Sequence, residues 1–158
     1  MSTTEASGDA RARPPLKPGE IKLEAVVVPV ADVDRAKAFY ESLGWRFDID
    51  FNPVPGVRAV QYTPPGSAAS IHFGDGITTM APGSQEGLVL AVADIDATRE
   101  DLIGRGIDVS ELWHFDPEKG QVPGRDPENR PYRTRASFSD PDGNGWVLQE
   151  ITERYPGR

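Results

Sequence analysis

An internal repeat constrains the fold of this 158-residue chain more than any other feature. Residues 30–34 (VADVD) reappear as residues 92–96 (VADID), at an offset of 62 positions. An apolar, β-branched run precedes each copy, and a segment with helical spacing of apolar residues follows each. Gly44 and Gly106 lie at the same offset, where glycine suits the end of a helix. The sequence therefore predicts a duplicated β-α-β-β-β unit.

Both copies predict the same set of elements. In the first, we expect strands over residues 23–30, 45–51, 57–63 and 69–73, and a helix within residues 31–44 that has Asp32 as its N-cap and Gly44 just after its end. In the second, we expect strands over residues 88–92, 109–115, 132–138 and 145–151, and a helix over residues 95–105. Neither unit is large enough for an independent core, so both are expected to form one domain.

The boundaries follow from the polar segments on either side of these units. The first twenty residues are small, polar and proline-rich without periodicity, which predicts a disordered tail. The expected organisation is a tail over 1–20, a single domain over 21–152 with modules 21–74 and 87–152 and a linker 75–86, and a C-terminal tail over 153–158.

Charge and residue usage exclude several classes of protein. A net charge of −8 disfavours binding to nucleic acid or to an anionic membrane surface. No apolar run is long enough for a membrane helix and no signal pattern opens the chain, so a cytoplasmic protein is expected. The chain has no Cys and two His, which excludes disulfides, thiol nucleophiles, zinc fingers and iron–sulfur ligation.

With the repeat in place, the sequence resembles the vicinal oxygen chelate superfamily, which includes glyoxalase I, bleomycin-resistance proteins, fosfomycin-resistance proteins and extradiol dioxygenases. Residues 30–34 leading into 39–44 (FYESLG), and residues 140–150 (DPDGNGWVLQE), carry the resemblance. It implies an α+β fold in which two tandem βαβββ modules form a curled, cup-shaped mixed sheet, with the helices outside and the ligand in the cup. It also implies a homodimer, because related proteins often pair modules between chains.

The resemblance further implies metal ligands on the first and last strands of each module. Ala25 and Gly87 fall on the first-strand positions, and neither can bind a metal. Glu150 matches the last-strand carboxylate, and His72 falls near the remaining position, where a shift of one residue would reverse its face. We therefore expect no cofactor. A divalent Ni, Zn, Fe or Mn ion, if one is used, would need Glu150, His72 and His114 as ligands.

Residues 116–131 form an unusually long connection, and long loops often serve as lids or binding loops. Aromatic and basic side chains flank it and would suit a planar or anionic small organic ligand. The alternative is a solvated insertion with aromatic residues at an interface. The expected ligand contacts are Trp113, His114, Tyr132, Arg133 and Arg135.

Glu150 has two interpretations that the sequence leaves open. It could act as a general base or ligand contact, or it could simply form an ion pair with Arg133 or Arg135. The favoured function is a small-molecule-binding protein without the family metal. The alternative is a lyase, isomerase or dioxygenase of the same superfamily that uses Glu150 with one or both histidines. A structural or regulatory protein without a ligand is a third, weaker hypothesis.

Overall fold

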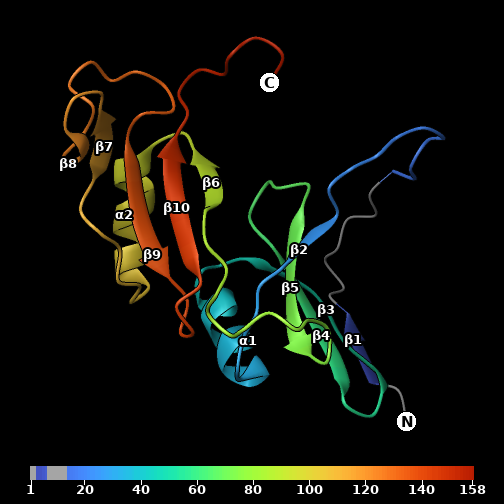
Figure 1. Cartoon of the computed structure of the whole chain (residues 1–158). Coiled ribbons are helices and arrows are strands. Elements are labelled where there is room, and N and C mark those ends of the chain that lie inside the picture. The colour runs from blue at the N-terminus through green and yellow to red at the C-terminus, as the bar shows by residue number, and fades with distance from the viewer. Residues whose placement is uncertain (1–2, 7–13) are drawn as a thin grey trace. The chain divides into compact units, whose positions relative to one another are not determined.

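The computed structural model describes residues 3–6 and 14–158, and the chain divides into two compact units, Met1–Ser84 and Gln85–Arg158. Each unit contains one of the predicted modules (Figure 1). The division falls inside the segment 75–86 that was expected to link them.

The first unit is a mixed five-stranded sheet with one helix. The sheet order is β1-β3-β4-β5-β2, in which β2 and β5 are parallel and the other pairs are antiparallel. Its elements are β1 (Thr3–Ala6), β2 (Ala25–Val27), α1 (Val33–Ser42), β3 (Arg46–Val54), β4 (Val57–Thr63) and β5 (Ser70–Asp75).

The second unit repeats this plan. The sheet order is β6-β10-β9-β7-β8, in which β6 and β10 are parallel and the other pairs are antiparallel. Its elements are β6 (Leu88–Val92), α2 (Ile95–Gly104), β7 (Trp113–Asp116), β8 (Gly120–Pro123), β9 (Arg135–Ser139) and β10 (Gly145–Glu150). The order β3-β4-β5-β2 corresponds to β7-β9-β10-β6, so the prediction of an α+β fold with two βαβββ modules is confirmed.

The repeated pentapeptide marks where each strand passes into its helix. Asp32 Oδ1 accepts a hydrogen bond from the backbone N–H of Arg35, and Asp94 Oδ1 accepts one from Ala97, each at 3.0 Å. Gly44 has the positive φ, 76°, that ends α1 as predicted. Both helices have ten residues, and in the described part of the chain no helix is long and apolar enough to cross a membrane.

Each helix covers one face of its own sheet. In the first unit, Tyr40 of α1 stacks on Phe73 of β5 at 5.4 Å between ring centroids. In the second unit, α2 packs on β9 and β10 (Figure 1). The buried apolar side chains there are Ile95, Leu102, Ala136, Phe138, Trp146 and Leu148. We call the opposite side of each sheet, turned away from its helix, the free face.

The structure differs from the sequence prediction mainly at the outer edges of the sheets. Within the expected tail 1–20, Thr3–Ala6 forms β1 and pairs with β3, while residues 1–2 and 7–13 lie outside the described part. The expected loop 116–131 contains β8, which pairs with β7. Both added strands cover the edge of the second strand of their module, whose backbone groups would otherwise lack partners.

Another difference lies where β9 begins. A strand was predicted over residues 132–138, with Arg133 on the same face as Arg135, but β9 begins only at Arg135. Tyr132 has a φ of 69°, which is incompatible with an extended strand, and residues 131–133 form a turn. Arg133 therefore belongs to that turn.

Two glycine-to-alanine substitutions should have opposite effects on stability. A Cβ at Gly74 would overlap the backbone carbonyl of Arg58 on β4, whereas a Cβ at Gly104 of α2 meets no atom within 4 Å. We expect Gly74→Ala to destabilise the fold by about 1 to 3 kcal/mol or more, and Gly104→Ala to stabilise it by up to about 1 kcal/mol. Urea denaturation followed by circular dichroism measures both, and two changes of the same sign would contradict this packing.

Candidate functional site

The face of β10 on which each side chain lies decides which residues can share a site. Trp146 and Leu148 are buried in the core beneath α2, and side chains alternate along a strand. Glu150 lies on that same face, where its Oε2 accepts a hydrogen bond of 2.9 Å from the backbone N–H of Ile95. Val147 and Gln149 consequently occupy the free face.

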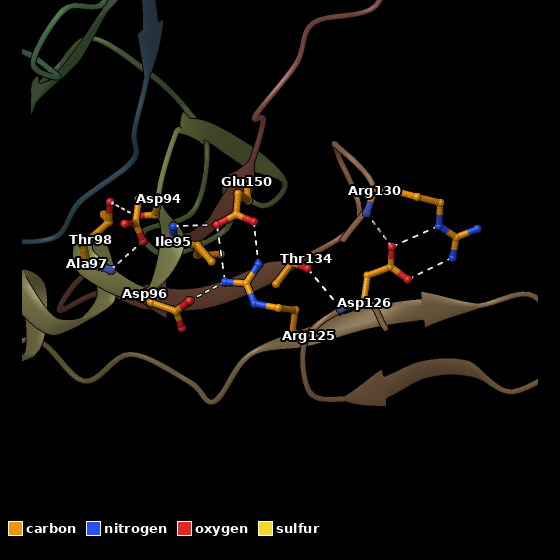
Figure 2. Close-up of polar contacts among 10 residues, drawn as sticks. All are labelled: Asp94, Ile95, Asp96, Ala97, Thr98, Arg125, Asp126, Arg130, Thr134 and Glu150. Atoms are coloured by element: carbon orange, nitrogen blue, oxygen red, sulfur yellow. Dashed lines mark hydrogen bonds and ion pairs between the residues drawn. The ribbon is translucent and has the colours of Figure 1, made fainter. Parts of the chain in front are cut away.

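Glu150 is tied to the start of α2 and to the long insertion (Figure 2). Arg125 Nη1 donates to Glu150 Oε1 at 2.6 Å, and Arg125 Nη2 contacts both Glu150 Oε2 and Asp96 of α2. The hydrogen bond to Glu150 is the main cause that raises the pKa of Arg125. The partner of Glu150 is thus Arg125, not Arg133 or Arg135 as one interpretation of the sequence expected.

This arrangement limits what Glu150 can do chemically. Both carboxylate oxygens accept hydrogen bonds from fixed donors, and the side chain is 12% exposed. A carboxylate that binds a metal or removes a proton needs an oxygen lone pair directed at its target. Glu150 would have to give up one of these bonds first, and its place on the α2 face differs from the place inside the cup that the resemblance implies.

The two histidines lie in different surroundings. His114 is buried, and its Nδ1 lies 2.7 Å from the carbonyl oxygen of Gly124. A carbonyl only accepts, so Nδ1 carries the proton. His72 belongs to the first unit, where it pairs with Gln61 in register between buried neighbours, so it lies on the free face of that sheet. Burial lowers the pKa of His72.

These side chains do not assemble into a metal centre within either unit. Over residues 3–6 and 14–158, no three His, Asp or Glu side chains are grouped so that they could hold a metal ion. Ala25 begins β2 and Gly87 directly precedes β6, so the first-strand positions contribute no ligand in the structure.

The free face of the second unit brings together an arginine and two aromatic rings. Trp113 pairs with Arg135 in register, and the guanidinium carbon lies 5.4 Å from the ring centroids of both Trp113 and Phe115. The two rings meet edge to face at 5.7 Å, and Trp113 Nε1 donates to Ser137 Oγ at 3.0 Å. We call Trp113, Phe115 and Arg135 the Arg135 cluster.

Arg135 carries a charge that no carboxylate balances within the described residues. Burial, together with the nearby charge of Arg133, lowers the pKa of Arg135, although a guanidinium stays protonated. Six other arginines each form an ion pair with a carboxylate: Arg46, Arg58, Arg99, Arg105, Arg125 and Arg130. Because an unpaired guanidinium next to aromatic rings attracts both anions and π-systems, the cluster is suited to a planar anion.

The insertion that follows the cluster is fixed by a buried carboxylate. Asp126 is 1% exposed and accepts three hydrogen bonds from Arg130, one from its backbone N–H and two from its guanidinium. The backbone N–H of Asp126 also donates to Thr134 Oγ1 at 3.1 Å (Figure 2). These bonds hold the chain as it returns to β9.

The predicted contact residues are therefore only partly together. Trp113 and Arg135 meet on the free face, Arg133 is exposed in the adjoining turn, and His114 faces the opposite way. Tyr132 packs against Tyr155, with ring centroids 4.4 Å apart. Phe115 is not among the predicted contacts, although its spacing of two from Trp113 places both residues on one face of a strand.

Comparison with known proteins identifies the family. The model of the Glyoxalase/Bleomycin resistance protein/Dioxygenase superfamily matches residues 22–148. The chain belongs to this superfamily. No curated protein matches the sequence.

Several solved structures of the superfamily are similar over most of the chain. TnmS3, an antibiotic binding protein from Streptomyces sp. CB03234, is 34% identical with a TM-score of 0.65, over 84% of this chain and 98% of its own. A glyoxalase/bleomycin resistance protein from the same organism is 35% identical with a TM-score of 0.62, over 82% and 100%. A superfamily member from Sphaerobacter thermophilus is 27% identical with a TM-score of 0.64, over 83% and 98%.

The buried Asp126 should give stability a specific pH dependence. Hydrogen bonds from Arg130 hold the pKa of Asp126 well below its usual range. Its stabilising effect is therefore complete above the unfolded-state pKa of about 3.9 and is lost as the pH falls below it. We expect Asp126→Asn to be less stable than the wild type at pH 7, and the difference to shrink from about pH 5 downward.

Denaturant unfolding at a series of pH values between 7 and 3 measures this difference. Asp108→Asn is the matched control, since Asp108 is exposed in the same unit. Parallel pH profiles for the wild type and Asp126→Asn would contradict the assigned role of the Asp126–Arg130 pair.

Proposed function

We propose that this superfamily member binds a small organic molecule that carries a planar aromatic ring and an anionic group, and that it does so without a metal. The observation that carries the proposal is the guanidinium of Arg135, which has no carboxylate partner among the described residues and contacts the rings of both Trp113 and Phe115. Phe115 is 49% exposed, so the cluster presents apolar surface to a ligand. Trp113 and Phe115 would pack against the ring, and Arg135 would bind the anion.

The energetics favour this use of the cluster. A cation over an aromatic ring contributes about 0.5 to 2 kcal/mol, depending on how well water is excluded. A ligand anion would balance the half-buried charge of Arg135 and form charge-assisted hydrogen bonds of roughly 1.5 to 3 kcal/mol. The exposed Arg133 adds a second positive charge beside the same site.

The similar structures support a natural-product ligand. TnmS3 is described as an antibiotic binding protein, and a second Streptomyces structure as a glyoxalase/bleomycin resistance protein. We infer that the ligand of this chain is an antibiotic-like aromatic compound and that the protein acts by holding it. A homodimer remains part of this proposal because the resemblance to the family implies it.

The residues at the implied metal-ligand positions support binding of the small molecule without a metal. Ala25 and Gly87 stand at the implied first-strand ligand positions, and Glu150 is bonded to Ile95 and Arg125. These residues do not fit the divalent ion of the family enzymes, so no catalytic step is assigned to one. Glu150 instead holds the insertion against α2.

Two dyes with a similar aromatic skeleton test the proposal. The anion 1-anilinonaphthalene-8-sulfonate (ANS) should bind, and the neutral N-phenyl-1-naphthylamine should bind more weakly. We expect Arg135→Gln to weaken ANS binding by about tenfold or more, because a charge-assisted contact contributes roughly 1.5 to 3 kcal/mol. The affinity for the neutral dye should change little. Fluorescence titration measures both affinities.

Arg105→Gln is the control, since Arg105 pairs with Asp101 on the surface of α2. It should leave both dye affinities unchanged, and EDTA should not alter ANS binding. Equal loss of both dyes in Arg135→Gln would contradict the role of the charge. Loss of ANS binding in EDTA would contradict the metal-free mode.

A further inference from the structure

Tyr132 combines an unusual backbone conformation with an unsatisfied side-chain hydroxyl. Its φ of 69° lies in the left-handed region, which residues other than glycine seldom adopt. Its hydroxyl is buried and has no hydrogen-bond partner among the described residues. Backbone strain is concentrated at functional sites, and a buried polar group without a partner is rare enough to need an explanation.

The ring of Tyr132 is covered by the C-terminal segment. Tyr155 stacks on it face to face, with centroids 4.4 Å apart and ring planes at 11°. Residues 152–158 are all exposed, and Tyr155 itself is 52% exposed. Within the described residues, the last backbone hydrogen bond from this end of the chain to the sheet joins Ile151 N–H to the carbonyl of Val92. The ring stack is therefore a main attachment of the tail.

The turn that holds Tyr132 adjoins the Arg135 cluster. Gln149 Nε2 donates to the carbonyl oxygen of Tyr132 at 2.9 Å, and Gln149 pairs with Arg135 in register on the free face. Trp113, Arg135 and Gln149 thus form one row across β7, β9 and β10. A ligand bound at the Arg135 cluster would have the turn of Tyr132 at the end of this row.

We propose that Tyr132 is a stacking platform for a planar ring of the ligand, and that Tyr155 occupies this platform as a displaceable lid when no ligand is bound. This inference rests on the proposed function. The ligand ring would replace one aromatic stack with another, and an oxygen acceptor on it would satisfy the Tyr132 hydroxyl. The expected ligand class is therefore an anionic aromatic compound that carries a hydroxyl, carbonyl or similar oxygen.

Removal of the lid should strengthen binding. A stacked aromatic pair corresponds to a factor of about 2 to 10 in an equilibrium constant, and a competitor that occupies the site reduces the apparent affinity by the fraction of sites left open. We expect Tyr155→Ala to tighten ANS binding by about 2- to 10-fold, and Tyr132→Ala to weaken it. Tyr155→Phe keeps the ring and should restore the wild-type affinity, while Glu153→Gln in the same tail serves as the control.

Trypsin cleavage after Arg154 reports directly on the lid. Release of residues 155–158, measured by mass spectrometry, should be slow in the ligand-free protein. It should accelerate when ANS binds, and in ligand-free Tyr132→Ala. Trypsin cleavage of an unrelated protein at an exposed arginine, measured with and without ANS, shows any effect of ANS on trypsin itself.

The outcomes separate this inference from the proposed function. If Arg135→Gln loses ANS binding but Tyr155→Ala does not tighten it, the lid is wrong and the proposed function stands. If Arg135→Gln leaves ANS binding unchanged, yet ANS accelerates release of residues 155–158, the proposed role of Arg135 is wrong, while the displacement of Tyr155 by a ligand is supported. Unchanged or weaker ANS binding in Tyr155→Ala overturns the inference, and so does a cleavage rate that ANS does not affect.

Discussion

The second module depends on the carboxylate of Glu150, which joins three parts of the chain that are distant in sequence. Glu150 ends β10, accepts the first free N–H of α2 at Ile95, and pairs with Arg125 of the insertion. A carboxylate at a helix N-terminus is favoured by the helix dipole, and a guanidinium completes its hydrogen bonds. The residue that resembles a catalytic group is therefore part of the framework that fixes the insertion beside the sheet.

Because Glu150 lies on the α2 face, the free face of the sheet carries a different set of side chains. Arg125 balances a carboxylate on the α2 face, whereas Arg135 lies beside two aromatic rings with no carboxylate partner in the described residues. The strand pair β9–β10 thus places Glu150, which is paired with Arg125, on the face covered by α2 and Arg135 on the free face. Superfamily membership is compatible with either catalysis or binding, so the residues at the site must decide the function.

The sequence predicts the elements well because their signals are local. The cap Asp32, the repeated pentapeptide, the apolar runs and the turn glycines each act over a few residues, so the duplicated modules could be derived directly. The site was predicted only in part, because its partnerships are long-range. No local pattern pairs Arg125 with Glu150, 25 positions apart. The positive φ of Tyr132 delays the start of the predicted strand to Arg135 and removes Arg133 from the face of β9.

The most direct test of a ligand site at the Arg135 cluster is the indole N–H region of a ¹H–¹⁵N correlation spectrum during titration with ANS. Trp113 lies in the cluster, whereas Trp45 and Trp146 are buried at 8% and 3% exposure. We expect the Trp113 signal to shift progressively on binding, the other two to stay in place, and the shift to be lost in Arg135→Gln. A Trp113 signal that stays fixed while ANS binds would contradict the assignment of the site.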